Sequence, residues 1–178
     1  MTPNFPPDSI WPVHPPRVET YCEASMVTHP LVSPLAAHPH LWQGAPPVYV
    51  CVGWEGMQDE TEVFARRVSQ AGTAVIFEGF IGMPHCFAMV PWCKSGFRAF
   101  QGWAGFCKDV VRGGTKNHSS SACWIDKKGK VTWISVDKLG MESSQLRGES
   151  RIPLDDEIVD RLMRKSREWR VSKEAKMR

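Results

Sequence analysis

Two ionisable residues, Glu55 and His85, follow two short apolar runs at positions where enzyme sites commonly form. Glu55 lies three residues after the run 48–52, and His85 lies in the loop after a second run at 74–78. In an open α/β sheet, active sites form beyond the carboxyl ends of parallel strands, so adjacent strands would bring these side chains together. A carboxylate beside an imidazole fixes its tautomer and makes the other ring nitrogen a useful general base. On spacing alone, a core histidine and a solvated loop acid explain the pair equally well.

The segments around these two residues predict a strand–helix–strand unit. The run 48–52 is short, unbroken and apolar, which is typical of a strand covered on both faces in a parallel sheet. A helix is predicted over 59–71, with Asp59 as its N-cap and Gly72 as its stop. The second strand is predicted at 74–78. A crossover of this kind is right-handed and makes the two strands parallel neighbours.

Further elements are predicted on both sides of this unit. Most of the 14 prolines lie within residues 1–47, which predicts an extended or turn-rich segment. A helix is predicted over 97–111, a hairpin from 123–125 and 131–136, and a last helix over 155–169 with acids first and bases last. The helix over 97–111 is indicated by an apolar stripe at helical spacing: Phe100, Ala104, Cys107 and Val111.

The predicted fold class is therefore α/β, in three segments. Residues 1–47 are a Pro-rich extended segment, 48–111 hold the parallel strands, and 112–178 hold the hairpin and a basic C-terminal helix. Residues 161–178 carry eight Lys and Arg against two Glu, a charge of +6. Since the whole chain has a net charge of +3, the rest of it carries −3. A frayed, solvated helix end explains such a run better than a nucleic-acid or membrane contact.

Several short segments occur in the order and at the intervals typical of one family. They are His29–Leu35, Ala45–Glu55, Asp59–Glu60 and Gly82–Phe87. Together they resemble the C-terminal part of α/β-hydrolases of the hormone-sensitive-lipase-like group, over about residues 10 to 111. The resemblance implies a partial α/β-hydrolase fold that contains its last two parallel strands and their crossover helix.

The resemblance also implies two members of a catalytic triad. In the family, the acid follows the seventh strand, usually as Asp in an Asp-x-Leu-x-Asp-Glu pattern, and the matching stretch here is Glu55–Glu60. This assigns Glu55 as the acid, with Asp59 in reserve. His85, in Pro84-His85-Cys86-Phe87, matches the catalytic histidine. The implied substrates are carboxylic esters with small to medium acyl groups, and no cofactor is expected.

The serine and the oxyanion hole of the family are missing from the sequence. Neither Gly-x-Ser-x-Gly nor His-Gly-Gly occurs. The segment 148–152 has Ser150 but lacks the second glycine and comes after the histidine, and Ser119, Ser120 and Ser121 lack both glycines. We therefore expect a truncated hydrolase, the C-terminal portion of an esterase or lipase-like enzyme, that is inactive alone.

One alternative from another class stays open at the sequence level. The chain is then a non-catalytic binding protein that uses Trp124, Trp133 and the basic tail as contact surfaces. A metal hydrolase using His29, His38 and His40 is disfavoured, because His38-Pro39-His40 lacks the i, i+4 spacing of a helical zinc site.

The remaining sequence features concern location and partners. No apolar run of about 18 residues and no secretory signal is present, which predicts a cytoplasmic protein with no membrane span, and no nucleic-acid partner is expected. Six cysteines without a C-x-x-C pair predict idle thiols and no metal site. In the family fold the strand 48–52 has a neighbour on each side, yet residues 1–47 offer none. An exposed edge strand that favours self-association is therefore expected.

Overall fold

The computed structural model describes residues 18–19, 22–90, 92–113, 119–142 and 152–177. The chain forms two compact units. Unit 1 consists of residues 1–37 together with 155–178, and unit 2 consists of residues 38–154. The candidate residues Glu55 and His85 both belong to unit 2.

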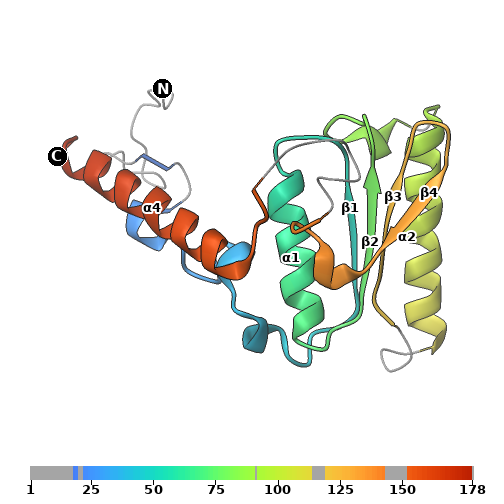
Figure 1. Cartoon of the computed structure of the whole chain (residues 1–178), viewed down its shortest axis with the longest axis horizontal. Coiled ribbons are helices and arrows are strands. Elements are labelled where there is room, and N and C mark those ends of the chain that lie inside the picture. The colour runs from blue at the N-terminus through green and yellow to red at the C-terminus, as the bar shows by residue number, and fades with distance from the viewer. Residues whose placement is uncertain (1–17, 20–21, 91, 114–118, 143–151, 178) are drawn as a thin grey trace, which may run out of the picture. The chain divides into compact units, whose positions relative to one another are not determined.

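Unit 2 is built on one four-stranded sheet with the order β1-β2-β3-β4 (Figure 1). Its strands are β1 (Val48–Val52), β2 (Val75–Phe80), β3 (Ser121–Ile125) and β4 (Val131–Ile134). The first three are parallel, and β4 is antiparallel to β3. The predicted parallel pair and the predicted hairpin are therefore present. The hairpin also extends the sheet, because β3 pairs with β2.

The crossover between β1 and β2 is α1 (Gln58–Gln70). Its end is as predicted, since Gly72 has a φ of 81° and so supplies the left-handed residue that closes the helix. The predicted cap is wrong. Met57 is the N-cap, without a side-chain hydrogen bond, and Asp59 lies inside the first turn, where its charge still favours the helix dipole.

The side of the sheet that α1 covers holds the larger apolar core. Val68 of α1 packs there with Val50, Phe77 and Trp124. Gly79 of β2 is required at this place, because a Cβ on it would lie 2.5 Å from the ring of Trp124. The buried indole thus fills space that a side chain on β2 would need.

The opposite side of the sheet is covered by α2 (Lys94–Gly113), as Figure 1 shows. Only Gly96 and Ala99 of this helix are buried. The predicted apolar stripe does not face the sheet, since Phe100 and Val111 are exposed. The helix instead approaches the sheet through Gly102. A Cβ at this position would lie 2.4 Å from the Glu78 carboxylate, so there is no room here for a larger side chain.

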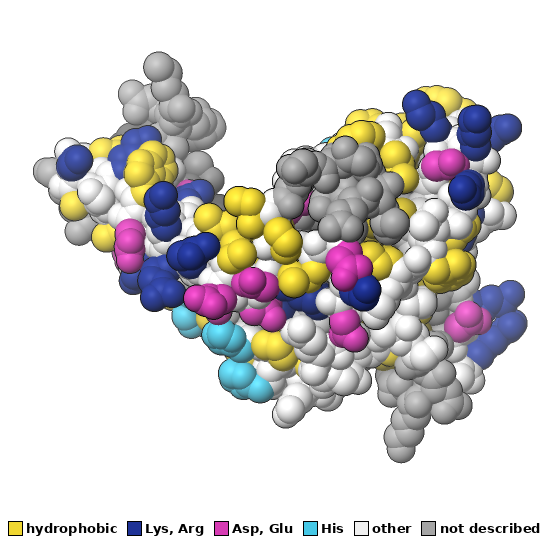
Figure 2. All heavy atoms as spheres, viewed as in Figure 1, with side chains coloured by type: hydrophobic (Ala, Val, Ile, Leu, Met, Phe, Trp, Pro, Cys, Tyr) yellow, Lys and Arg dark blue, Asp and Glu magenta, His cyan; other side chains and the backbone are white. Residues whose placement is uncertain are grey.

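The connection between β3 and β4 is a polar turn. The Asp126 carboxylate accepts hydrogen bonds from the backbone N–H groups of Lys128 and Lys130, and Gly129 has a φ of 84°. Strand β4 is shorter than predicted, because Val136 already belongs to a 3₁₀ turn, η6 (Val136–Lys138). At the end of the sheet where β3 turns into β4, Lys and Arg side chains gather beside exposed hydrophobic ones (Figure 2).

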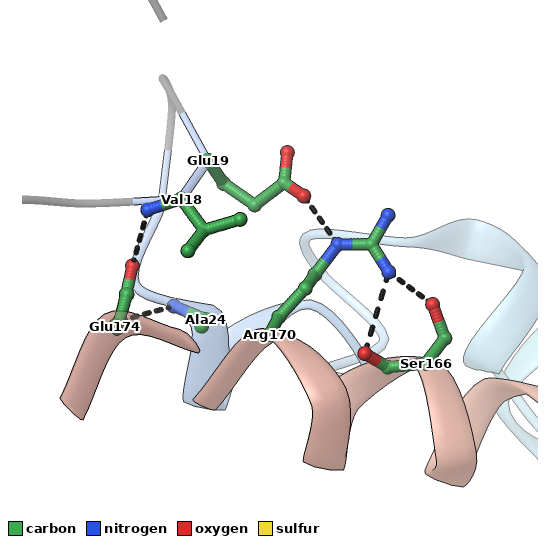
Figure 3. Close-up of polar contacts among 6 residues, drawn as sticks. All are labelled: Val18, Glu19, Ala24, Ser166, Arg170 and Glu174. Atoms are coloured by element: carbon green, nitrogen blue, oxygen red, sulfur yellow. Dashed lines mark hydrogen bonds and ion pairs between the residues drawn. The ribbon is translucent and has the colours of Figure 1, made fainter. Parts of the chain in front are cut away.

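Unit 1 contains α4 (Asp156–Ala175), which begins at an Asp155 N-cap and runs beyond the predicted 155–169. Its last turns bind the segment that precedes the short turn η1 (Ala24–Met26). Glu174 is buried and accepts hydrogen bonds from the backbone N–H groups of Val18 and Ala24, at 3.0 and 3.3 Å (Figure 3).

Two arginines of α4 add to this attachment. Arg170 pairs with Glu19, and Arg167 donates to the carbonyl oxygen of Ser25 at 2.8 Å. The expectation of a frayed, solvated helix end is therefore wrong for this part of the tail. The described part of residues 18–47 contains only 3₁₀ turns and irregular backbone, in keeping with its prolines. Among the described helices, none combines the length and apolar character needed to cross a membrane.

Candidate active site

Glu55 and His85 meet beyond the carboxyl ends of β1 and β2. Because these strands are parallel neighbours, the loops that follow them leave the sheet at the same edge. The His85 Nδ1 and the Glu55 carboxylate form a hydrogen bond. The predicted contact between the two side chains is therefore present, while their catalytic role stays a prediction.

The pair combines a shielded acid with an accessible base. The Glu55 side chain is 14% exposed and that of His85 is 65% exposed. With Nδ1 directed to the carboxylate, Nε2 is the nitrogen left to exchange a proton with a reactant. Asp59, the reserve acid, lies in the first turn of α1, whereas the carboxylate observed against His85 is that of Glu55.

A close backbone contact ties the two loops together. The Trp54 N–H donates to the Met83 carbonyl oxygen at 2.7 Å. Gly53 lies against the same group, because a Cβ on Gly53 would be 2.3 Å from the Met83 oxygen and 2.9 Å from the Pro84 oxygen. This role was not predicted from the sequence, although the position of Gly53 directly after a strand was a signal for it.

We expect Gly53→Ala to separate Glu55 from His85. The new methyl group would force the two loop backbones apart, at a cost of about 1–3 kcal/mol in unfolding free energy. The low-field proton signal of an imidazole Nδ1–H bonded to a carboxylate should therefore disappear from the ¹H NMR spectrum.

The matched control for this variant lies in the same loop. A Cβ on Gly56 would have no atom within 4 Å, so Gly56→Ala should keep the signal. A folded Gly53→Ala protein that retains the low-field proton would show that the glycine does not position the pair.

The loop that carries His85 is anchored on its other side by Phe87. This ring is buried and lies 4.9 Å, centroid to centroid, from Phe80 at the end of β2. Between the two residues the backbone turns through Cys86, whose φ of 59° is uncommon for a residue other than glycine. His85 is thus held between the Met83 contact and a buried ring.

The candidate serines do not join this pair. Ser120 accepts a hydrogen bond from the backbone N–H of Val75 and contacts the hydroxyl of Ser69, at 3.1 Å in each case. Val75 begins β2, so Ser119, Ser120 and Ser121 lie at the amino end of the parallel strands, opposite to the edge with His85. Ser150 lies outside the described residues.

A second ionic cluster, missed in the sequence, lies between α2 and the sheet. The Glu78 carboxylate on β2 accepts from the Tyr49 hydroxyl and from Arg98 of α2, both at 2.6 Å. Burial first, and Glu78 second, raise the pKa of Tyr49 far above its usual value, so the phenol stays protonated. A glutamate inside the apolar run of β2 was the only signal. The Glu78 carboxylate is itself buried and is used by Tyr49 and by Arg98 of the covering helix, which indicates a structural role.

Two thiols flank Glu78 in the same row of the sheet. Cys51 and Cys123 are the register partners of Glu78 on β1 and β3. Burial, followed by the nearby carboxylate, raises the pKa of Cys51 to about 12 and that of Cys123 to about 11. Cys51, Cys86, Cys93, Cys107 and Cys123 are free thiols, and Cys86 and Cys107 are exposed.

We expect thiol reactivity to separate these two classes. With iodoacetamide at pH 8, Cys86 and Cys107 should be modified in the folded protein, whereas Cys51 and Cys123 should react only after denaturation, because the thiolate is the nucleophile. Mass spectrometry of peptides reports each site. Folding raises the pKa of the Cys51 and Cys123 thiols from 9.0. Their contribution to the stability of the fold is therefore complete below about pH 9 and is lost as the pH rises toward 11 to 12. Equal labelling of all four thiols would contradict the buried arrangement.

The histidine-rich segment has no metal geometry. His38 and His40 stack with ring centroids 6.1 Å apart. Within the described ranges, no group of three or more His, Cys, Asp or Glu side chains is arranged to hold a metal ion.

Part of the chain is similar to a known protein family. Residues 13–89 match the family model described as alpha/beta hydrolase fold. No curated protein and no solved structure matches the chain significantly. The matched segment contains β1, α1, β2 and both Glu55 and His85. The predicted resemblance and the predicted partial α/β-hydrolase fold are confirmed.

Proposed function

Since residues 13–89 match the alpha/beta hydrolase fold family, we propose that the chain is the C-terminal portion of a serine carboxylic ester hydrolase. The observation that carries the proposal is the contact between His85 Nδ1 and Glu55 beyond two parallel strands. Esters with small to medium acyl groups are the proposed substrates of the complete enzyme. The cytoplasmic location stays a prediction.

In the proposed mechanism, His85 acts first as base and then as acid. Its Nε2 removes the proton of a serine hydroxyl as that oxygen attacks the ester carbonyl, and then returns the proton to the leaving alkoxide. Glu55 orients the ring and stabilises the imidazolium. The serine and the oxyanion hole belong to the part of the enzyme that this sequence lacks.

A hybrid enzyme tests this proposal directly. Residues 13–111 of this chain would replace the corresponding part of an active α/β-hydrolase that keeps its own serine and oxyanion hole. We expect the hybrid to hydrolyse a short-chain p-nitrophenyl ester. His85→Ala should lower kcat by roughly 10⁴-fold or more, and Glu55→Gln by a comparable factor.

Asp59→Asn is the matched control in the same hybrid, and it should leave kcat within a few-fold of the parent. A folded hybrid whose turnover is unaffected by His85→Ala would contradict the proposed role. Strong loss in Asp59→Asn with little loss in Glu55→Gln would move the acid to the reserve position. In-frame DNA upstream of Met1 that encodes His-Gly-Gly and Gly-x-Ser-x-Gly would favour the hydrolase over a non-catalytic protein.

The non-catalytic alternative retains one supporting observation. Trp133 on β4 is exposed and available for contact. Trp124, the other proposed contact residue, is fully buried in the core, so it offers no surface. The alternative is therefore the weaker of the two functions.

A free strand edge supports the proposal that this chain pairs with another. Within the described residues, β1 pairs with β2 alone and is an edge of the sheet. Its outer N–H and C=O groups are a template for another strand. We expect poor solubility or self-association in gel filtration, and a monodisperse monomer at all concentrations would contradict this.

A further inference from the structure

The helix α4 attaches to the rest of unit 1 by one of its sides. Only Val159 and Glu174 of this helix are buried. Arg167 and Arg170 lie toward the same side, where they bind the Ser25 carbonyl oxygen and Glu19. The attachment is therefore mainly polar, and it leaves most of the large apolar side chains of α4 out of the core.

The opposite side of α4 carries a row of apolar and basic side chains. The row, called the α4 basic row below, runs in steps of three and four residues, which places its members on one face of the helix: Leu162, Lys165, Trp169, Lys173 and Lys176. Leu162 is 51% exposed and Trp169 57%, and the three lysines are exposed as well. The Lys173 ammonium lies over the Trp169 ring, 4.9 Å from a ring centroid, so the row presents a cation and an aromatic ring at one point.

The surface around the row is strongly cationic. Between residues 161 and 177, the exposed charged side chains are five bases and one acid, a charge of +4: Arg161, Arg164, Lys165, Lys173, Lys176 and Glu168. Figure 2 shows Lys and Arg side chains along α4 beside hydrophobic ones. The partner that complements this surface is therefore anionic.

The apolar members of the row distinguish between two anionic partners, a nucleic acid and a lipid surface. A nucleic acid is bound mainly through its phosphates, by basic and polar side chains, and Leu162 gains little there. At a lipid surface, leucine and tryptophan enter the boundary between headgroups and acyl chains, while lysines beside them extend to the anionic headgroups. From this complementarity we propose that the α4 basic row binds the surface of a bilayer that contains anionic lipids, with α4 parallel to that surface. This binding does not depend on the proposed hydrolase function.

Sedimentation of the full chain with sucrose-loaded vesicles tests the proposal. We expect binding to phosphatidylcholine vesicles that contain about 30% phosphatidylserine, and at least roughly tenfold weaker binding to phosphatidylcholine alone. Raising the salt from about 0.1 to about 0.5 M should weaken the binding, because it screens exposed charges. Equal binding to both kinds of vesicle, or binding to neither, would overturn the proposal. Binding of a single-stranded RNA without binding to vesicles would also overturn it and would identify the partner as nucleic acid.

Removal of the three lysines tests the row itself. A variant that combines Lys165→Gln, Lys173→Gln and Lys176→Gln should bind the anionic vesicles roughly 100-fold more weakly, at about fivefold for each lysine near the surface. Because all three side chains are exposed, the variant should fold, and circular dichroism verifies this.

The matched control lies in the turn between β3 and β4. Together, Lys127→Gln, Lys128→Gln and Lys130→Gln remove the same charge from exposed positions outside α4, and they should leave the vesicle Kd within about threefold. An equal loss in both triple variants would show that the net charge of the chain, and not the row, binds the vesicles, and would overturn the proposal.

Trp169 tests the apolar part of the contact. Trp169→Ala should weaken binding roughly tenfold, since it removes apolar surface that the lipid would bury. Trp103→Ala, at a residue of α2 that is 53% exposed, should change it by less than about twofold. Lipids brominated on their acyl chains should quench part of the tryptophan fluorescence of the wild type, and this part should be missing in Trp169→Phe. A Trp169→Ala protein that binds like wild type, with no quenching lost in Trp169→Phe, would overturn the proposed contact.

Discussion

The purified chain is expected to show no ester turnover above background. In the proposed function, the chain supplies only the acid and histidine of a triad, and neither Gly-x-Ser-x-Gly nor His-Gly-Gly occurs in its sequence. Loss of one oxyanion-hole donor alone costs about 10²-fold in kcat, and loss of a triad nucleophile about 10⁶-fold. A p-nitrophenyl acetate assay with stopped-flow or absorbance detection measures this directly.

His85→Ala is the control for this prediction. Since the proposed function leaves His85 without a serine to activate in the isolated chain, the variant and the wild type should give the same background rate. Turnover that His85→Ala abolishes would reveal a nucleophile elsewhere in the chain. Cys86→Ser would then be the next variant, since the Cys86 thiol is exposed and directly follows the histidine.

A second large effect is expected for Arg66, which is buried in α1. Its guanidinium donates to the carbonyl oxygens of Leu139 at 2.6 Å and Leu154 at 2.8 Å. Arg66→Met keeps the aliphatic bulk but leaves two carbonyls unsatisfied. At about 1.5–3 kcal/mol for each bond to a charged donor, we expect the two bonds to account for a loss of about 3–6 kcal/mol. This is a large fraction of the roughly 5–15 kcal/mol that stabilises a typical domain.

Urea denaturation followed by tryptophan fluorescence measures this loss. Arg112→Met is the matched control, because Arg112 is exposed on α2 and a surface substitution should change stability by less than about 0.5 kcal/mol. A difference between the two variants below about 1 kcal/mol would show that the segment around Leu139 and Leu154 is not held by Arg66.

The strand–helix–strand unit and the candidate site could be predicted because local patterns determine them. Unbroken apolar runs marked β1 and β2, and the crossover rule made them parallel, which was enough to bring Glu55 to His85. The hairpin was also visible locally. Its pairing with β2 was not, since a polar turn gives no information about which existing edge a strand joins.

The errors arose where contacts distant in sequence decide the outcome. Periodicity identified α2 but did not show which face meets the sheet, because a helix can present glycine and alanine to a sheet when an ion pair lies beneath it. The ion pair between Glu78 and Arg98 could not be predicted either, because the two residues lie on different elements and meet only in the folded chain. The tail of α4 was expected to fray because its binding partners, Val18 and Glu19, precede it by about 150 residues.

The attachment of α4 to the start of the chain has a consequence for the order of folding during synthesis. Unit 1 needs both residues 18–37 and the helix that ends at Ala175, whereas unit 2 needs only the stretch between them. At about 5–20 residues per second, translation of the roughly 120 residues of unit 2 takes about 6 to 24 s. Throughout this time the residues that later bind Glu174 and Arg170 have no helix to bind. Unit 2 can therefore form on the ribosome, while unit 1 can assemble only after the last turn of α4 has emerged.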